Sequence, residues 1–296
     1  MKNILIIGAN GFTGRRILND LSVNPIYHVT GCSLRDDICP GKDYRFVRTD
    51  IRDENEVRKL FKECRPDIVI NTSALSVPDY CETHHAEAEA TNVTAVETIA
   101  HVCEQYGSRF IHLSTDFVFD GKSTRLYKEE DEAIPVNYYG VTKLKAEKII
   151  ASICSNYAIV RVVVVYGKAL PGQHGNILQL VANRLRNGET IRVVSDQWRT
   201  PTFVGDISVG VEKLMFHTAN GIYHICGSEC LTIAEIAYRV ADFLKLDRSL
   251  IEPVTTEEMK EVTPRPRSSG ISIEKAKAEI GYTPRTLEEG MEASLF

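Results

Sequence analysis

The feature that most constrains this fold is a set of three glycines close to the start of the chain. The apolar run Asn3–Ile7 leads directly into Gly8-Ala-Asn-Gly11-Phe-Thr-Gly14, and apolar residues then recur at helical spacing. Glycine permits a tight turn and lets backbone N–H groups approach a pyrophosphate, while the start of a helix offers unpaired donors and partial positive charge. A strand, a G-x-x-G-x-x-G loop and a helix in this order predict a dinucleotide site.

Residues 1–166 alternate short apolar runs with helical stretches. Several runs are continuously apolar, as expected for parallel strands covered on both faces. Strand–helix–strand alternation produces right-handed βαβ units, so we predict an α/β fold with a Rossmann-type doubly wound parallel sheet. The expected strands are Asn3–Ile7, His28–Ser33, Arg45–Val47, Asp67–Asn71, Arg109–Ser114 and Ala158–Val165, and the expected helices lie near residues 12–21, 53–63, 83–106 and 137–151.

The pattern loosens after residue 166. We therefore predict a dinucleotide-binding Rossmann domain over residues 1–166. Residues 167–296 are expected to form mainly a smaller C-terminal α/β substrate-binding domain, with some late elements returning to the first domain. The elements expected here are helices near 176–187 and 206–217, strands at 190–194 and 221–226, and a helix that begins with a capping box of Thr232 and Glu235.

Composition excludes several classes of protein. The 296 residues are 43% hydrophobic and 25% charged, as in an ordinary globular chain, and the net charge of −5 argues against a dedicated nucleic-acid binder. No apolar run approaches the roughly 20 residues of a membrane helix, and the apolar start is too short for a signal peptide. The eight cysteines show no C-x-x-C spacing, so neither a metal site nor a disulfide framework is predicted. We expect a cytoplasmic protein that binds no membrane.

The residue that reads the ribose in such a fold lies about 20 residues past the glycine loop. There, Arg35 and Asp36 follow the second expected strand. An arginine would hold the 2′-phosphate of NADP, whereas an acidic residue would hydrogen-bond the 2′-hydroxyl of NAD. Because Arg35 comes first, NADP(H) is favoured over NAD(H), and Asp36 keeps NAD(H) open.

A second motif carries acid–base chemistry. Of the twelve tyrosines only Tyr139 has a lysine, Lys143, four residues later, so the two share a helix face. A lysine beside a phenol favours the phenolate and allows proton exchange with a carbonyl near neutral pH. Thr115 and Asp116 follow the apolar strand Arg109–Ser114, at the edge where α/β sheets bind ligands. Without the support of this strand end, Tyr139 and Lys143 would be interpreted as an exposed pair on a helix surface. The alternative for Thr115 is a helix cap or turn residue, and that for Asp116 is a turn residue.

Taken together, these motifs resemble the extended short-chain dehydrogenase/reductases, and within them the dTDP-4-dehydrorhamnose reductase family. The resemblance covers nearly the whole chain in order, including the stretches Leu113–Gly121 and Pro135–Glu147. It implies NAD(P)H-dependent reduction of the C4 keto group of a nucleotide-diphosphate deoxysugar, with dTDP-4-dehydro-L-rhamnose the first choice. Tyr139 would donate the proton, Lys143 would lower its pKa and hold the nicotinamide ribose, and Thr115 would supply the active-site hydroxyl.

The same resemblance implies two sets of binding residues. Three positions depart from the family pattern: the family often has Tyr where this chain has Phe117, Trp where it has Val164 and Gly where it has Arg199. The type of reaction is therefore better supported than the identity of the sugar. Mg²⁺ enters through the resemblance alone, since no ligand cluster predicts a metal, and a homodimer is compatible with it. The cofactor set is Gly8, Asn10, Gly11, Phe12, Gly14, Arg35, Asp50, Ile51, Asn71, Tyr139 and Lys143, and the substrate set is Ser76, Asp116, Phe117, Val164, Arg199 and Arg265, of which the two arginines would meet the diphosphate.

Two alternatives remain open. A non-catalytic NADP-binding subunit resembling the regulatory beta subunit of methionine adenosyltransferase would share the fold and the Gln-Trp-Arg-Thr-Pro-Thr stretch. A nucleotide-sugar epimerase or dehydratase would share the fold too, although Phe117 after Asp116 counts against the acid pair of a dehydratase. A reductase releases oxidised cofactor at each turnover, whereas an epimerase retains it.

Overall fold

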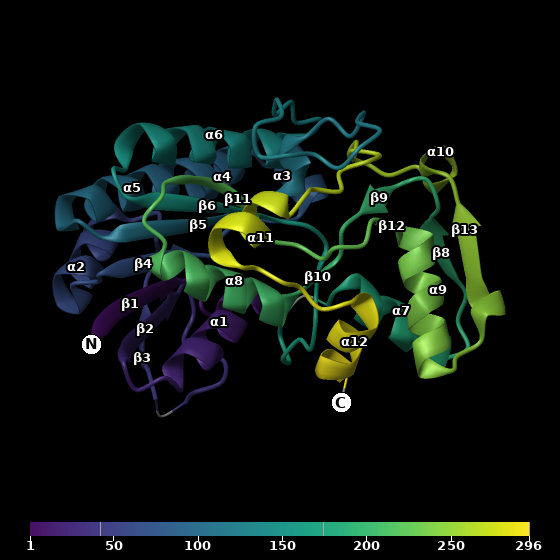
Figure 1. Ribbon diagram of the computed structural model, residues 1–296, viewed down its shortest axis with the longest axis horizontal. Helices are drawn as coiled ribbons and strands as arrows, with labels where there is room; N and C mark the ends of the chain where they lie inside the picture. The colour runs from purple at the N-terminus through teal and green to yellow at the C-terminus, as the bar shows by residue number, and fades with distance from the viewer. Residues whose placement is uncertain (42, 174, 296) are drawn as a thin grey trace.

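The computed structural model describes residues 1–41, 43–173 and 175–295. Within that part of the chain, seven parallel strands form one sheet in the order β11-β6-β5-β4-β1-β2-β3, with helices on both faces (Figure 1). The predicted Rossmann-type doubly wound sheet is confirmed. Its strands are β1 (Lys2–Ile7), β2 (Tyr27–Ser33), β3 (Arg45–Arg48), β4 (Ile68–Asn71), β5 (Arg109–Thr115), β6 (Tyr157–Val162) and β11 (Gly221–His224), and the helices packed on it include α1 (Phe12–Ser22), α2 (Glu54–Cys64), α5 (Ala95–Tyr106), α6 (Tyr138–Ile153) and α8 (Val204–Phe216).

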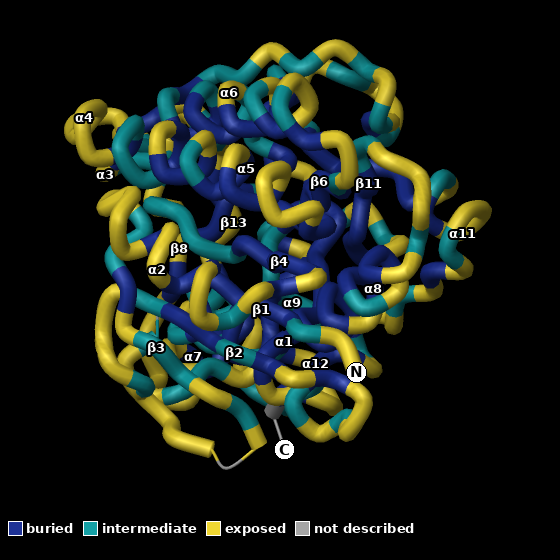
Figure 2. Tube along the Cα trace, turned by 90° about the vertical axis from the view of Figure 1, so that its left-hand side faces the viewer, coloured by how far each residue is buried: buried dark blue, intermediate teal, exposed yellow. Residues whose placement is uncertain are grey.

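Alternate residues of each strand enter different cores, because the side chains of a strand point to opposite faces. In β1, Ile4 and Ile6 pack with α1 and α8. Leu5 and Ile7 pack with α2, α5 and α6 on the other face. Figure 2 shows the central strands as buried segments inside this shell of helices. Burial on both faces accounts for the continuously apolar strand sequences.

The helix expected over residues 83–106 is interrupted. α3 (Pro78–Thr83) and α4 (His85–Glu89) precede a π-helical turn, η1 (Ala90–Thr94), which leads into α5. Asn92 in that turn is buried and donates to the carbonyl oxygen of Leu75 and to Thr142 Oγ1, both at 3.0 Å. The turn therefore attaches the segment after β4 to α6.

The second half of the chain contributes both to the sheet and to a separate apolar cluster. β11 and α8 belong to the sheet. The predicted capping box is present, since Thr232 and Glu235 each bond the other's backbone N–H. Whether residue 166 divides two domains stays a prediction. The separate cluster combines β8 (Ile191–Val194), its parallel partner β13 (Ile251–Val254), α7 (Ile177–Arg186), α9 (Ile233–Leu244) and α12 (Leu287–Leu295), and Figure 1 places α9 and β13 at the end of the molecule away from β1–β3.

Residues 264–272, here called the tail segment, run beside several distant parts of the chain. The N–H of Ser268 donates to the carbonyl of Gly121 at 3.0 Å, and the carbonyl of Pro264 accepts from the side chain of Asn137 at 2.9 Å. No helix in the described ranges is long and apolar enough to cross a membrane. The remaining short elements are η2 (Asp116–Val118), β7 (Val165–Tyr166), β9 (Trp198–Arg199), β10 (Thr202–Phe203), β12 (Leu231–Thr232), η3 (Arg248–Leu250), α10 (Thr256–Met259) and α11 (Glu274–Ile280).

Candidate active site

The glycine loop has the geometry that a pyrophosphate requires. Gly8 has a φ of +82°, in the left-handed region that favours glycine. A Cβ on Gly14 would lie 2.3 Å from the carbonyl oxygen of Gly8, and a Cβ on Gly8 would lie 2.7 Å from the backbone nitrogen of Ser73. Gly11 caps α1 without a side-chain hydrogen bond, which leaves the first N–H groups of the helix open to an anion. The loop therefore fits the phosphates of a dinucleotide.

Two side chains that sequence reasoning missed hold this loop. Gln173 donates to the carbonyl oxygens of Asn10 at 3.0 Å and Gly11 at 3.1 Å. Arg15 is buried, donates to Asn10 Oδ1 at 2.8 Å and forms an ion pair with Asp37. Both residues reach across irregular segments, where no periodic pattern marks a partner. Together they fix the backbone that a cofactor would touch.

The segment after β2 leaves both candidate ribose-reading residues available. Arg35 and Asp36 are exposed, and no side-chain partner of either lies within the described ranges. The side chain of Asn10 donates to their backbone carbonyls at 3.2 Å and 2.9 Å. Asp37, the third charged residue of this segment, forms an ion pair with Arg15. The choice between NADP and NAD therefore stays with Arg35 and Asp36.

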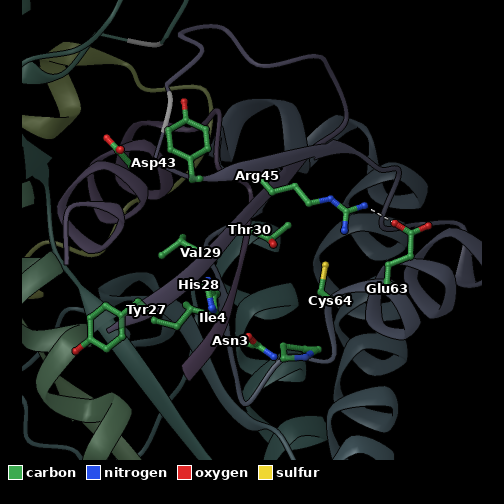
Figure 3. A pocket seen from close by; sticks show the side chains of 12 residues that line it. Asn3, Ile4, Tyr27, His28, Val29, Thr30, Asp43, Arg45, Glu63 and Cys64 are labelled. Carbon is green, nitrogen blue, oxygen red and sulfur yellow. Dashed lines mark hydrogen bonds and ion pairs between the residues drawn. The ribbon is translucent and has the colours of Figure 1, made fainter. Parts of the chain in front are cut away.

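Two cavities lie beside the outer strands of the sheet. One of about 530 Å³ adjoins the carboxyl end of β3 and is lined by Leu34, Asp50 and Lys59 among others. The other, of about 420 Å³, lies at the amino ends of β1–β3, where Figure 3 shows Arg45 directed at Glu63. Since α/β sheets bind ligands at the carboxyl edge, the first is the better place for an adenine. Asp50, a member of the predicted cofactor set, lines this cavity, whereas Ile51 of the same set is partly buried and is only its neighbour in sequence.

The catalytic candidates meet at the carboxyl end of β5. Thr115 is the last residue of β5, and its hydroxyl lies close enough to the phenol of Tyr139 on α6 to lower the pKa of that phenol. Tyr139 is 9% exposed and lies in an apolar cluster with Cys81 and Phe117, whose ring meets it edge-on with the centroids 5.8 Å apart. Gly140, unnoticed in the sequence, permits this approach, because a Cβ there would lie 2.2 Å from the carbonyl oxygen of Phe117. A close approach of α6 to the residues after β5 thus brings Tyr139 to Thr115.

Lys143 lies one turn after Tyr139 and is directed at β5. Its ammonium donates to the carbonyl oxygen of Leu113 at 2.7 Å and lies 3.0 Å from His112 Nε2. The other ring nitrogen of His112 faces the side-chain amide of Asn71 at 3.2 Å. All three side chains are buried, so they form a polar chain beneath the site. His112 was missed because a histidine inside an apolar strand carries no positional signal.

Burial dominates the titration of the two candidate catalytic groups. It raises the pKa of Tyr139 well above 10, and the carboxylate of Asp116 acts in the same direction, against the hydrogen bond with Thr115. Burial also lowers the pKa of Lys143 to about 8, against the attraction of Glu147. The pKa of Tyr139 therefore shifts in the direction opposite to the one expected from Lys143, whose ammonium is directed at the carbonyl oxygen of Leu113. The phenol of Tyr139 therefore keeps its proton near neutral pH.

The residues expected to contact the sugar do not all face one site. Ser76 is exposed in the segment between β4 and α3. Val164 has a φ of +38° between β6 and β7, a strained conformation for a β-branched residue. Arg199 is 2% exposed, and its guanidinium bonds backbone carbonyls of the tail segment. Its expected contact with a diphosphate would require those bonds to break.

Arg265 remains better placed for an anion than Arg199. It is partly exposed and lies between Asp79 at 3.8 Å and Glu261 at 3.3 Å. Both distances to the carboxylates are longer than in a tight, charge-assisted ion pair, so the guanidinium can turn towards a phosphate. Among the described residues, no group of three or more His, Cys, Asp or Glu side chains could hold a metal ion.

Comparison with known proteins gives a consistent result. The family model described as "RmlD substrate binding domain" matches residues 1–295. A probable low-salt glycan biosynthesis reductase, Agl14, of Haloferax volcanii is 30% identical over 97% of this chain and 95% of its own length. Methionine adenosyltransferase 2 subunit beta of Xenopus laevis is 31% identical over 96% of this chain and 84% of its own. The crystal structure of dTDP-4-dehydrorhamnose reductase from Bacillus anthracis in complex with NADP superposes with a TM-score of 0.86, at 27% identity and over 99% of this chain and 98% of that one.

Proposed function

The chain belongs to the RmlD substrate binding domain family, and from that premise we propose that it is an NAD(P)H-dependent reductase of nucleotide-diphosphate 4-keto-6-deoxysugars. The proposed substrate is dTDP-4-dehydro-L-rhamnose and the proposed product dTDP-L-rhamnose. The family that the sequence motifs predicted is confirmed. Support for the cofactor comes from the NADP-bound B. anthracis enzyme and from the open glycine loop. The exposed Arg35 makes NADP(H) the preferred form in this proposal.

In the proposed reaction C4 of the sugar would receive a hydride, which is the chemistry that a nicotinamide supplies when it is bound beside the sugar. Tyr139 donates a proton to the C4 oxygen, and the hydroxyl of Thr115 orients that oxygen. Lys143 would hold the nicotinamide ribose, and the glycine loop would hold the pyrophosphate. Phe117 contributes an apolar wall beside the phenol, which excludes water from the proton transfer.

One observation carries this proposal above the others. Thr115 at the carboxyl end of β5 and the phenol of Tyr139 on α6 are both buried and lie close together, since the hydroxyl of Thr115 lowers the pKa of that phenol. The glycine loop leaves β1 at its carboxyl end, and β1 and β5 are parallel strands of one sheet separated only by β4. The proposed proton donor, Tyr139, and the proposed cofactor loop thus lie at the same edge of the sheet. A hydride transfer needs this arrangement, because the cofactor and the substrate must meet.

A coupled assay tests the substrate. The protein is incubated with NADPH and the 4-keto-6-deoxysugar that a dTDP-glucose dehydratase forms, with and without a 3,5-epimerase, and NADPH absorbance is followed. Oxidation that depends on the epimerase is the expected result. Oxidation without the epimerase would point to another deoxysugar, and no oxidation with either sugar would contradict the proposed substrate class.

A second candidate is a regulatory subunit that binds NADP without turning it over. The 31% identity to methionine adenosyltransferase 2 subunit beta favours it. The same assay separates the two, because a regulatory subunit would bind NADPH tightly in a fluorescence titration and leave every sugar unreduced. Co-purification with a methionine adenosyltransferase catalytic subunit would then support this second candidate.

A further inference from the structure

The polar chain that ends at Lys143 allows each of its hydrogen bonds to be given a direction. Asn71 is the last residue of β4, and both it and His112 in β5 are buried. The side-chain amide of Asn71 lies 3.2 Å from Nδ1 of His112, and Nε2 of His112 lies 3.0 Å from Nζ of Lys143. Nζ also donates to the carbonyl oxygen of Leu113 at 2.7 Å. Each contact needs one donor and one acceptor, so a group of fixed role at one end decides the rest.

The backbone of Ser73 fixes the orientation of the Asn71 amide. The N–H of Ser73 donates to Oδ1 of Asn71 at 3.0 Å, and the hydroxyl of Ser73 donates to the same oxygen at 2.6 Å. A backbone N–H can only donate, so the oxygen of the amide must face it. The nitrogen of the amide therefore faces Nδ1 of His112, to which it can only donate.

The tautomer of His112 follows from this orientation. Because Nδ1 accepts from Asn71, the proton of the neutral ring lies on Nε2. The ring is neutral near neutral pH, since burial and the charge of Lys143 lower the pKa of His112 well below 6.5. The Nε2–H group faces Nζ of Lys143, so Nζ must accept. An amine has a lone pair for this bond, whereas an ammonium has none.

Any arrangement with a charged Lys143 leaves two donors in contact. If the ammonium donates to Nε2 of His112, the proton of the ring moves to Nδ1 and faces the NH₂ group of Asn71. If the amide of Asn71 turns over to accept that proton, its NH₂ group meets the N–H of Ser73 instead. A buried donor without an acceptor is costly, so the polar chain disfavours the ammonium.

We propose that His112, oriented by Asn71, is a positioning residue that favours the amine form of Lys143 over the ammonium. The amine accepts from Nε2–H of His112, donates one proton to the carbonyl oxygen of Leu113 and keeps its second proton for a further acceptor. The meaning of this form for the reaction rests on the proposed function, in which the further acceptor is a hydroxyl of the nicotinamide ribose. Lys143 would then bind the ribose without bringing a charge into a buried site.

The charged groups around Lys143 do not reverse this preference. Glu147, one turn further along α6, attracts the ammonium, but burial outweighs that attraction and lowers the pKa of Lys143 to about 8. Glu147 is itself bonded by the guanidinium of Arg161 on β6, at 3.0 Å and 2.6 Å. The N–H of His112 acts in the same direction as burial, so we expect a pKa of Lys143 below 8. Carboxylates of other elements packed against α6 have partners of their own: Asp116 with Arg199, Glu82 with the N–H of Tyr138, Glu89 with Lys145 and Glu104 with Ser155.

The first test determines the tautomer of His112 directly. Nitrogen-15 spectra of the histidine side chains are recorded on the full chain without added cofactor, because ring nitrogens with and without a proton give well separated signals. His112→Phe identifies the signals of His112, for which we expect the proton on Nε2. His224 is the matched control, since its Nδ1 faces the carbonyl oxygen of Ser272 at 3.1 Å, which can only accept. His224 should therefore carry its proton on Nδ1.

The second test follows the ionisation of Lys143. Its ¹³Cε signal, identified with Lys143→Met, moves when Nζ gains a proton, and we expect a midpoint below pH 8. Asn71→Leu removes the donor to Nδ1 of His112, so the ring can keep its proton there and accept from the ammonium. The midpoint should then rise by about one pH unit, a tenfold change in the ratio of amine to ammonium. A purely structural effect has the opposite sign, because a more apolar surrounding lowers the pKa of a lysine.

The outcomes separate this inference from the proposed function. Ser73→Ala is the control for Asn71→Leu, because it removes the hydroxyl and leaves the backbone N–H that orients Asn71, so the midpoint of Lys143 should stay unchanged. A proton on Nδ1 of His112, or a midpoint that does not rise in folded Asn71→Leu, would overturn the positioning role. If Asn71→Leu does not fold, the tautomer in the unmodified protein decides alone. If both signals are as expected while Lys143→Met binds NADPH as tightly as the unmodified protein, the proposed ribose contact is wrong and the direction of the hydrogen bonds stands.

Discussion

At the scale of single residues, the two neighbouring tyrosines of α6 provide an internal comparison. Tyr139 is buried against Thr115, whereas the phenol of Tyr138 donates to Glu89 at 2.8 Å, away from the site. We predict that Tyr139→Phe lowers kcat by about 10²–10⁴-fold, the usual contribution of positioned proton transfer, with NADPH affinity nearly unchanged. Tyr138→Phe should stay within about twofold of the unmodified protein. Comparable losses in both variants would mean that the phenol of Tyr139 has no chemical role.

The cofactor preference also belongs to single residues. Arg35→Ala should weaken NADPH binding by about tenfold or more, because a charge-assisted hydrogen bond contributes about 1.5–3 kcal/mol. NADH binding should change little. Asp36→Ala is the matched control, since both side chains are exposed on the same segment. Fluorescence titration of each of the two variants with NADPH and with NADH gives the ratio of the two affinities. If that ratio changes in Asp36→Ala and not in Arg35→Ala, Asp36 is the residue that sets the cofactor preference.

The sequence predicts some of these residues and misses others for a physical reason. Thr115, Tyr139 and the glycines carry their roles in local patterns, so a motif identifies them. The roles of Arg15 and His112 come from partners that are far away in sequence, such as Asp37 and Lys143. No spacing rule relates such pairs before the strands are assembled.

At the scale of elements, the contact between α6 and the turn after β5 decides the geometry of the site. We predict that Gly140→Ala lowers kcat by at least tenfold and the thermal midpoint measurably, because its Cβ would meet the carbonyl oxygen of Phe117 at 2.2 Å and push Tyr139 away from Thr115. Gly175→Ala is the control, since its Cβ would meet only Gln179 Oε1 at 3.7 Å. A Gly140→Ala protein with normal kcat would show that α6 needs no such approach.

Element boundaries were predictable where burial alone sets them. β1, β2 and β5 lie close to the apolar runs that predicted them, and the capping box of Thr232 correctly placed the start of α9. The break in the helix expected over residues 83–106 was not predictable, because Asn92 is satisfied by Leu75 and Thr142, 17 and 50 residues away. Tertiary hydrogen bonds outweighed a favourable helical pattern there.

At the scale of the whole molecule, two buried histidines make stability depend on pH. Burial lowers the pKa of His112 well below 6.5 and that of His224 to about 3. Unfolded histidine binds a proton below about pH 6.5 and these folded ones do not, so their contribution to stability is full above that pH and is lost as pH falls. The free energy of unfolding should drop by up to about 1.4 kcal/mol per pH unit for each histidine.

Urea unfolding between pH 7 and pH 5 checks this, above the range where most carboxyl groups titrate. His224→Gln should halve the slope, because it removes one of the two histidines and leaves an amide that can still bond the carbonyl of Ser272. A variant slope equal to that of the unmodified protein would assign the acid sensitivity to other groups.

The tail segment contacts parts of the protein that are synthesised long before it. Its backbone bonds the cap residue of α6 through Pro264, the guanidinium of Arg199 through Pro266 and the loop after β5 through Ser268. A ribosome delivers these residues more than a hundred positions after Tyr139. A nascent chain that has finished β1 to β6 contains Tyr139 and Asp116 but still lacks Gln173, which bonds the glycine loop, and the partners of Asp116 at residues 199 and 269. The contacts of the glycine loop and those of Asp116 are thus completed only by residues that follow β6, so a protein shortened at its carboxyl end would lack them.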